Sequence, residues 1–290
     1  MIAQNFEYSA PTNLTEALNL LGSGEAKALA GGMSLIPLMK LRLATPEQVV
    51  DLGRIPDLNY IRQDGKLIRI GATATHYDIE SSALLRSSCP LLAEAASNIG
   101  DVQVRNRGTI GGSIAHADPA ADYPASLLAL EARVVLVNSK AQREISVADF
   151  FVDTFTTALE PGELVREVIV PVEEQSVGVS YQKVVQPASG FAIVGIAARI
   201  GKSSGKINFA RIGVTGLAGK PFRATGVEQA LQGSAGSPDD IQKASAQITS
   251  DMDKAGLDAN SDLHASANYR RHLAQIHCMR AIRVASSRIA

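Results

Sequence analysis

The sequence has few of the residues that build iron–sulfur clusters, zinc sites and stacking surfaces. It contains two cysteines, Cys89 and Cys278, it has no tryptophan, and aromatic residues make up 4% of the chain. Two cysteines cannot supply the four thiolates of an iron–sulfur cluster or of a four-cysteine zinc site within one chain. So few aromatic side chains leave no stacking platform for single-stranded nucleic acid. We expect two reduced thiols, with a disulfide as the alternative.

The sequence also lacks an excess of charge and a long apolar segment. Its formal net charge is −1, which gives no basic field that would attract nucleic acid or an anionic membrane. No apolar run reaches the roughly 18 residues that span a bilayer. The opening residues MIAQNFEY lack the basic and apolar regions of a signal peptide. We therefore expect a cytoplasmic protein with no membrane span and no nucleic-acid partner.

What remains is an ordinary globular composition, with 46% hydrophobic and 20% charged residues over 290 positions, enough for two domains or one large one. Alternating helix and strand patterns in the first part predict a small parallel sheet. The middle part has the pattern of an α+β region with an antiparallel sheet, and the last part has strands followed by helices. The expected helices cover residues 13–22, 34–43, 77–85, 91–99, 224–232, 238–250 and 266–288, and the expected strands cover 26–30, 48–52, 66–72, 133–137, 145–147, 164–170, 180–185, 192–200 and 209–215. The turn-rich residues 171–176 are the best candidate for a domain boundary.

A first glycine-rich turn, Ala30-Gly31-Gly32-Met33-Ser34, lies between an expected strand and an expected helix. Backbone N–H groups at such a position favour an anion. The turn matches neither the Rossmann fingerprint nor a Walker loop. Taken alone, an ordinary strand-to-helix turn explains the glycine pair as well.

A second glycine-rich turn covers residues 107–113, RGTIGGS, and leads into Asp118 and Asp122. Its glycines permit close approach of a ligand, and Thr109 and Ser113 add hydroxyls. The two carboxylates are four residues apart in sequence, so one helical turn would place them on one face, where they could accept hydrogen bonds from ribose or ribityl hydroxyls. The alternative is an irregular loop whose Asp side chains cap a helix over 123–130. Two such turns facing each other could hold the two phosphates of a dinucleotide.

These segments together carry a specific resemblance. Residues 30–40 (AGGMSLIPLMK), 104–113 (VRNRGTIGGS) and 118–124 (DPAADYP) resemble the FAD-binding medium subunit of the molybdenum hydroxylases, nearest to the carbon monoxide dehydrogenase group of the xanthine dehydrogenase family. The resemblance covers essentially the whole chain. It implies an α+β fold of the vanillyl-alcohol-oxidase (PCMH) type, with FAD-binding subdomains over 1–55 and 56–175. A C-terminal domain over 176–290 would contain three antiparallel strands and a helical bundle.

The resemblance also implies which residues hold FAD and that none is catalytic or a metal ligand. The two turns would cradle the pyrophosphate, Asp122 would lie at the sugar-alcohol portion, Val165 and Lys183 at the adenine and outer region, and Phe191 near the isoalloxazine ring. Met33 stands where many relatives of the carbon monoxide group carry His, which weakens carbon monoxide as the substrate. The implied cofactor-binding residues are Ala30, Gly31, Gly32, Met33, Ser34, Leu35, Thr109, Ile110, Gly111, Gly112, Ser113, Asp118, Asp122, Val165, Lys183 and Phe191.

The function implied is electron transfer within a heteromeric enzyme. A large partner subunit would carry the molybdenum cofactor, a small partner subunit would carry [2Fe–2S] clusters, and FAD in this chain would pass electrons to an external acceptor. We expect a dimer of such heterotrimers. NAD, oxygen, a quinone and a carrier protein all stay open as acceptors, and the substrate is open too. The alternatives are a self-sufficient FAD-dependent oxidase or reductase of the same fold, and a nucleotide-binding module without catalysis.

Overall fold

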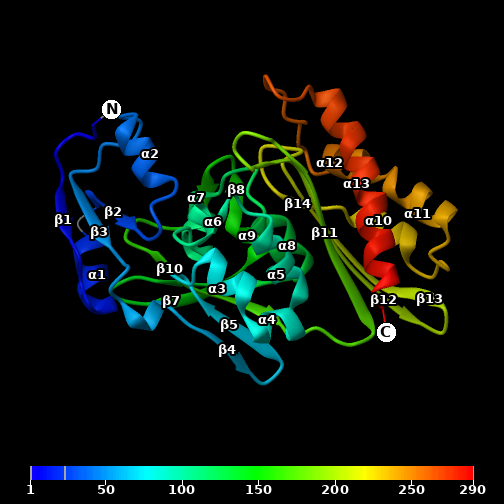
Figure 1. Ribbon diagram of the computed structural model, residues 1–290, viewed down its shortest axis with the longest axis horizontal. Coiled ribbons are helices and arrows are strands. Elements are labelled where there is room, and N and C mark those ends of the chain that lie inside the picture. The colour runs from blue at the N-terminus through cyan, green and yellow to red at the C-terminus, as the bar shows by residue number, and fades with distance from the viewer. Residues whose placement is uncertain (1, 23, 290) are drawn as a thin grey trace.

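The computed structural model describes residues 2–22 and 24–289, which form three parts in sequence order from one end of the molecule to the other (Figure 1). The first part has a parallel sheet in the order β1-β3-β2, as the sequence pattern predicts. Asn13 caps α1 by accepting a hydrogen bond from the Glu16 amide, and the apolar face of α1 packs toward β3. The elements are β1 (Glu7–Ser9), α1 (Leu14–Leu21), β2 (Ala26–Leu29), α2 (Leu35–Lys40) and β3 (Gln48–Asp51).

The second part has a five-stranded antiparallel sheet in the order β4-β5-β10-β6-β7, which confirms the expected sheet type. Helices α3, α5, α7 and α8 share its core. The strands are β4 (Ile61–Asp64), β5 (Leu67–Gly71), β6 (Arg133–Val137), β7 (Gln142–Ser146) and β10 (Leu164–Pro171), with a small hairpin of β8 (Phe151–Asp153) and β9 (Thr156–Thr157). The helices are η1 (Pro56–Leu58), α3 (His76–Ser81), α4 (Ala83–Ser88), α5 (Pro90–Ser97), α6 (Val102–Arg105), α7 (Ile110–His116), α8 (Tyr123–Ala129) and α9 (Val147–Phe150).

Two local predictions in this part are wrong. Residues 77–85, expected as one helix, form α3 and the start of α4, because extended Ser82 ends the first helix and accepts the Leu85 amide to begin the second. The second half of the second glycine turn, from Ile110, forms the start of helix α7, although glycine is a poor helix former. Thr109 caps α7 by accepting from the Gly112 amide, while Ile110 and Ile114 are buried in the core. Capping and core packing outweigh the low propensity.

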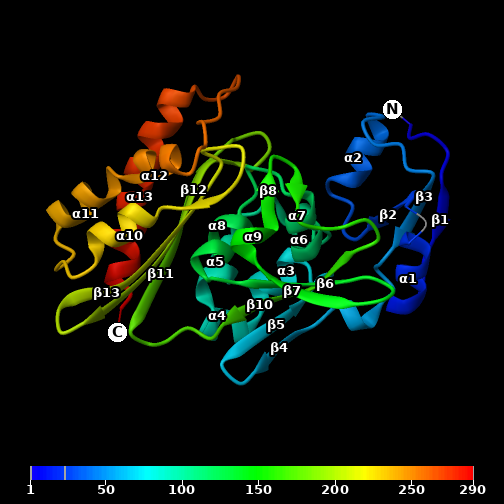
Figure 2. The ribbon, with the colours of Figure 1, turned by 180° about the vertical axis from the view of Figure 1, so that it is seen from behind.

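The third part has a sheet in the order β11-β12-β13-β14. Three long antiparallel strands were expected; β14 adds two residues, too short to show a pattern. Helix α13 packs on β11 and β12, while α5 and α8 pack on the other side of the sheet (Figures 1 and 2). The expected helix 238–250 is divided into α11 and α12. The elements are β11 (Val177–Val185), β12 (Ala192–Ser203), β13 (Lys206–Thr215), β14 (Phe222–Arg223), α10 (Thr225–Leu231), α11 (Pro238–Ser245), α12 (Ile248–Lys254) and α13 (Ala267–Ser287).

The two cysteines lie in different cores. Cys89 belongs to the core of the second part and Cys278 to the core of the third part, and both are buried free thiols. Burial raises the pKa of each thiol to about 12, so both stay protonated at neutral pH. Over residues 2–22 and 24–289, no helix is both long enough and apolar enough to cross a membrane.

Candidate cofactor-binding site

The fold brings the two glycine turns into contact. A Cβ atom built on Gly31 would lie 2.0 Å from the carbonyl oxygen of Arg107 and 2.8 Å from the Cα of Gly108. On the other side of the second turn, a Cβ built on Gly112 would lie 3.9 Å from the Cβ of Ala30. Only a residue without a side chain at position 31 allows this approach.

The first turn presents unpaired backbone donors. Among the described residues, the amides of the five consecutive residues from Gly31 to Leu35 donate no hydrogen bond. Gly32 has a φ of 76°, and the Ser34 hydroxyl makes no capping hydrogen bond. Consecutive free amides around a residue of positive φ form a concave anion-binding surface. The turn therefore has the donor set that a pyrophosphate needs.

In the second turn, the amides from Ile110 to Ser113 donate hydrogen bonds inside the protein. Ile110 and Gly111 donate to the carbonyls of Ala74 and Ala72, at 3.1 and 2.9 Å. Gly112 donates to the Thr109 hydroxyl at 3.2 Å, and Ser113 donates to the Thr109 carbonyl. What this turn offers a ligand is the exposed face of Gly112 and the Ser113 hydroxyl, rather than a row of free N–H groups.

A buried pair of rings supports the second turn from behind. The amide of His76 donates to the Gly108 carbonyl at 2.9 Å, and His76 Nδ1 lies 3.1 Å from the hydroxyl of fully buried Tyr123. Burial, with a smaller effect of Arg105, lowers the pKa of His76 to about 4. His76 is therefore neutral near pH 7. The sequence does not indicate this role, because a histidine at the start of a helix carries no signal of such a contact.

Asp118 and Asp122 do not share a helical face. The alternative of an irregular loop is correct, but neither side chain caps α8. They lie in an irregular loop, where Asp118 accepts the Ala120 amide at 2.8 Å. Asp122 is 4% exposed and accepts hydrogen bonds from the Tyr181 hydroxyl at 2.6 Å and the Lys183 ammonium at 2.9 Å. Burial raises the pKa of Asp122 to about 6, against the lowering effects of Lys183 and Tyr181.

Val165 and Phe191 take very different positions. Val165 is buried in β10, beside Arg166, whose carbonyl accepts the Ala72 amide behind Gly111. Phe191 is 43% exposed in the turn between β11 and β12. The next residue, Ala192, donates to the Ala120 carbonyl at 3.1 Å. Phe191 is thus held at the border of the loop that carries Asp118 and Asp122.

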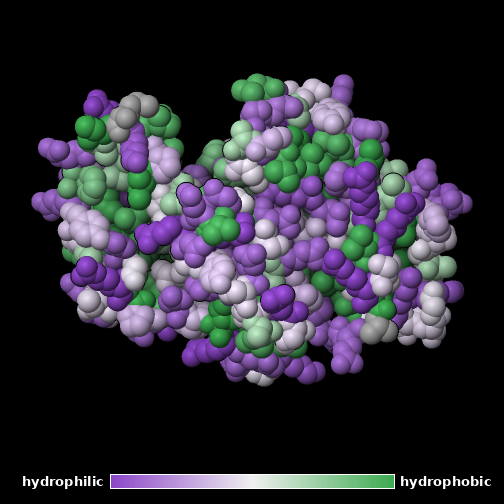
Figure 3. Space-filling view, viewed as in Figure 1, coloured by the Kyte–Doolittle hydropathy of each residue, from purple (hydrophilic) through white to green (hydrophobic). Residues whose placement is uncertain are grey.

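A notch separates the first part from the rest of the molecule at the top of Figure 3. In the ribbon, α2 lies on one side of this notch and α7 on the other (Figure 1). The first turn leads directly into α2 and the second turn opens α7, so both turns adjoin the helices that border the notch.

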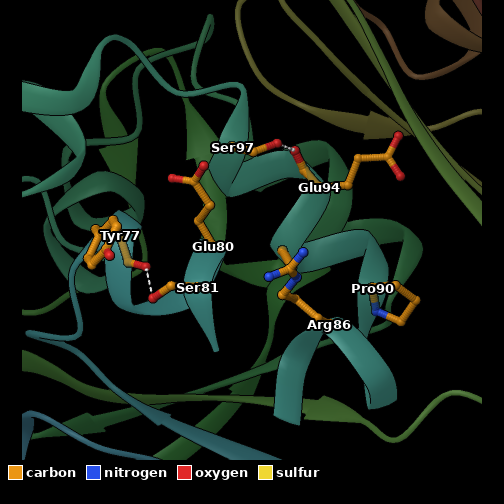
Figure 4. A pocket seen from close by; sticks show the side chains of 8 residues that line it. Tyr77, Glu80, Ser81, Arg86, Pro90, Glu94 and Ser97 are labelled. Atoms are coloured by element: carbon orange, nitrogen blue, oxygen red, sulfur yellow. Dashed lines mark hydrogen bonds between the residues drawn. The ribbon is translucent and has the colours of Figure 1, made fainter. Parts of the chain in front are cut away.

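A second hollow lies elsewhere, over α3, α4 and α5 (Figure 4). Its volume is about 430 Å³, yet it contains none of the predicted site residues. Its two carboxylates are already paired, Glu80 with Arg105 and Glu94 with Arg288. Over the described residues, no three His, Cys, Asp or Glu side chains gather as a metal site.

The chain matches known protein families over most of its length. Residues 4–173 match the family model of the FAD binding domain in molybdopterin dehydrogenase, and residues 179–285 match that of the CO dehydrogenase flavoprotein C-terminal domain. The chain is 40% identical to the carbon monoxide dehydrogenase medium chain of Hydrogenophaga pseudoflava over 100% of both chains. It is 36% identical to the glyceraldehyde dehydrogenase medium chain of Sulfolobus acidocaldarius, over 98% of this chain and 99% of that one.

A solved structure has the same fold throughout. It is that of carbon monoxide dehydrogenase from Hydrogenophaga pseudoflava lacking the Mo-pyranopterin moiety of the molybdenum cofactor, with a TM-score of 0.95, 41% identity and full coverage of both chains. The expected FAD-binding fold, with its C-terminal domain, is confirmed. This chain therefore belongs to the family of FAD-binding medium subunits of molybdenum hydroxylases, oxidoreductases that include the carbon monoxide dehydrogenases.

Proposed function

We propose that this chain binds FAD in the notch, with the pyrophosphate on the free amides of the first turn. The observation that carries the proposal is the row of unpaired donors from Gly31 to Leu35 beside the bare face of Gly112. The negatively charged oxygens of a pyrophosphate would accept hydrogen bonds from amides that donate none within the protein. FAD, when bound, supplies the electron-accepting and electron-donating chemistry.

The other site residues serve this cofactor in different ways. Thr109 and Ser113 contribute hydroxyls beside the pyrophosphate, and Asp118 lies toward the sugar-alcohol portion. Phe191 covers part of the isoalloxazine ring. Asp122 and Lys183 are already paired with each other, so they act by fixing the loop rather than by free charge. Val165 supports the second turn from the core. The full set proposed is Ala30, Gly31, Gly32, Met33, Ser34, Leu35, Thr109, Ile110, Gly111, Gly112, Ser113, Asp118, Asp122, Val165, Lys183 and Phe191.

We further propose that the chain works in the cytoplasm as the electron-transfer subunit of a molybdenum hydroxylase. Electrons would arrive from [2Fe–2S] clusters in a small partner subunit, after substrate oxidation at the molybdenum cofactor of a large partner subunit, and leave for an external acceptor. Two such heterotrimers would pair. Complexes of this kind are supported by relatives described as medium chains or subunits and by the solved carbon monoxide dehydrogenases.

A self-sufficient oxidase or reductase would need a positioned acid or base at the flavin. The buried titratable groups nearest the two turns are engaged elsewhere: His76 with Tyr123, and Asp122 with Tyr181 and Lys183. The electron-transfer function fits this arrangement better.

The experiment is purification of the chain with its natural partners, followed by an absorption spectrum and identification of the released cofactor. We expect an oxidised-flavin spectrum, release of FAD on denaturation, and molybdenum and iron in the same complex. Absence of flavin would contradict the FAD site. Flavin without molybdenum or iron would favour the self-sufficient enzyme.

A further inference from the structure

A buried polar cluster joins the third part of the chain to the loop beside the notch. The hydroxyl of Tyr181 donates to Asp122 Oδ1 at 2.6 Å. The ammonium of Lys183 donates to Asp122 Oδ2 at 2.9 Å and to the Asn98 carbonyl at 2.8 Å. Tyr181 and Lys183 are two residues apart on β11, so their side chains leave the same face of the strand.

We propose that Tyr181 is a positioning residue of the flavin site, whose hydroxyl holds the Asp122 carboxylate and, through it, the Lys183 ammonium. This inference rests on the proposed function. Tyr181 lies inside the protein, 3% exposed, and is not expected to contact FAD itself. Its effect passes through the loop 117–122 and the turn 98–100.

The position of the Tyr181 ring is built into the sheet. A Cβ atom on Gly195 of neighbouring β12 would lie 2.4 Å from the Tyr181 hydroxyl oxygen, so the glycine leaves the space that the hydroxyl occupies. The Tyr181 amide donates to the Glu94 carboxylate of α5 at 3.2 Å. The hydroxyl therefore reaches Asp122 from a fixed direction.

The carbonyls of the loop beside the notch are held by the same part of the chain. The Thr215 hydroxyl lies within hydrogen-bond distance of the carbonyls of Pro119 and Ala121, at 2.9 and 2.7 Å. The Ala192 amide donates to the Ala120 carbonyl. The Asp122 cluster fixes the end of this loop, so that all of its residues from 119 to 122 depend on the third part.

The turn 98–100 completes the arrangement. Lys183 donates to the first of its carbonyls, and Arg105 donates to the carbonyls of Ile99 and Gly100 at 3.2 and 3.1 Å. A Cβ on Gly190, next to Phe191, would lie 3.1 Å from the Cα of Gly100. Displacement of Lys183 would therefore shift the turn that carries Phe191.

Removing the Tyr181 hydroxyl moves the pH sensitivity of this cluster toward neutral pH. Asp122 would keep Lys183 as its one strong donor, and a buried carboxylate with fewer donors is harder to ionise. The ionisable groups that face it are Lys183, Tyr181 and Tyr123, while Glu94 meets the backbone of Tyr181. In Tyr181→Phe, the pKa of Asp122 rises further, and protonation near neutral pH leaves Lys183 without a counter-charge.

The test uses the full chain assembled with its partner subunits, stripped of flavin and titrated with FAD between about pH 6 and pH 8.5. For Tyr181→Phe we expect FAD to bind about tenfold more weakly at the acid end, with affinity recovering toward the alkaline end. The matched control is Tyr60→Phe, which also removes a hydroxyl that donates to a buried carboxylate, Glu167, at 2.6 Å. Its FAD affinity should follow that of the wild type across this range.

An unchanged FAD affinity in Tyr181→Phe, or an equal loss at every pH, would overturn the inference, because a packing role alone has no pH dependence. A wild-type complex that binds no FAD overturns the proposed function and this inference together. Wild-type binding with an unaffected Tyr181→Phe variant overturns the inference alone.

Discussion

At the scale of single residues, Gly31 sets how closely the two turns approach. Any side chain at this position meets the backbone of Arg107, which cannot rotate away. The first turn would have to move, and its free amides would lose their arrangement. The two neighbouring turns thus depend on one missing Cβ atom.

We therefore expect Gly31→Ala to lose FAD, with at least about tenfold weaker binding, while most of the fold survives. The measurement is the flavin-to-protein ratio after gel filtration, together with the melting temperature. Gly22→Ala is the control, because a Cβ there meets only carbonyl oxygens at 3.4 Å. Equal flavin content in both variants would show that the close approach of the turns is not needed.

His76 makes stability depend on pH at the same scale. Its pKa is about 4 in the folded chain and 6.5 as the ordinary value, so the unfolded chain binds more protons between these values. The contribution of neutral His76 to the free energy of unfolding is therefore fully present above about pH 6.5. It decreases by about 3 kcal/mol as the pH falls toward 4. The advantage of the wild type over His76→Gln in urea unfolding should shrink across this window. A constant difference would contradict the assignment.

At the scale of elements, α7 is a short helix that contains two consecutive glycines and depends on its cap. Thr109 Oγ1 accepts the Gly112 amide at 3.2 Å. We expect Thr109→Val to lower the free energy of unfolding by about 1 kcal/mol, because the amide loses its acceptor. Thr109→Ser keeps the oxygen and should stay close to the wild type in urea unfolding. Similar losses in the two variants would assign the effect to the Thr109 methyl group instead.

At the scale of the whole molecule, the third sheet contributes side chains to the core of the second part, and a buried ion pair also joins the two parts. Val179, Tyr181 and Ala197 of the third sheet belong to the core cluster of the second part. Glu173, in the segment that joins these parts, binds Arg199 of β12 through both carboxylate oxygens at 2.7 and 2.8 Å. Both side chains of this pair are buried, so the ion pair connects the joining segment to β12 inside the protein.

Glu173→Ala leaves the buried Arg199 guanidinium without its counter-charge, and we expect a loss of about 3 kcal/mol in the free energy of unfolding. The control is Glu144→Ala, which removes the partner of Arg133 in a pair that is about two-fifths exposed and should cost less than about 1 kcal/mol. Denaturant unfolding of both variants checks this. Equal, small losses of unfolding free energy in both variants would mean that the Glu173–Arg199 pair contributes little to stability.

The family, the cofactor and the two turns were predictable from the sequence, because short segments with a recognisable spacing of glycines and hydroxyls indicate them. The sheet types were predictable too, since alternation of helix and strand patterns is local. The helix break at Ser82 and the helix that begins in the second turn were not predictable from the sequence. Helix capping and core contacts determine them, and these outweigh the helix propensities of the residues.

What the sequence by itself determined is the order of the elements and the presence of the two glycine turns. Only the tertiary structure decided which turn keeps its amides free. In the second turn, the carbonyls of Ala72 and Ala74 accept hydrogen bonds from the amides of Gly111 and Ile110. It also decided that Asp122, an expected sugar contact, is bound by Tyr181 and Lys183, which follow it by 59 and 61 residues. Such residues come into contact because the second and third parts pack together. Contacts between distant segments produce no periodic pattern in the sequence of either segment.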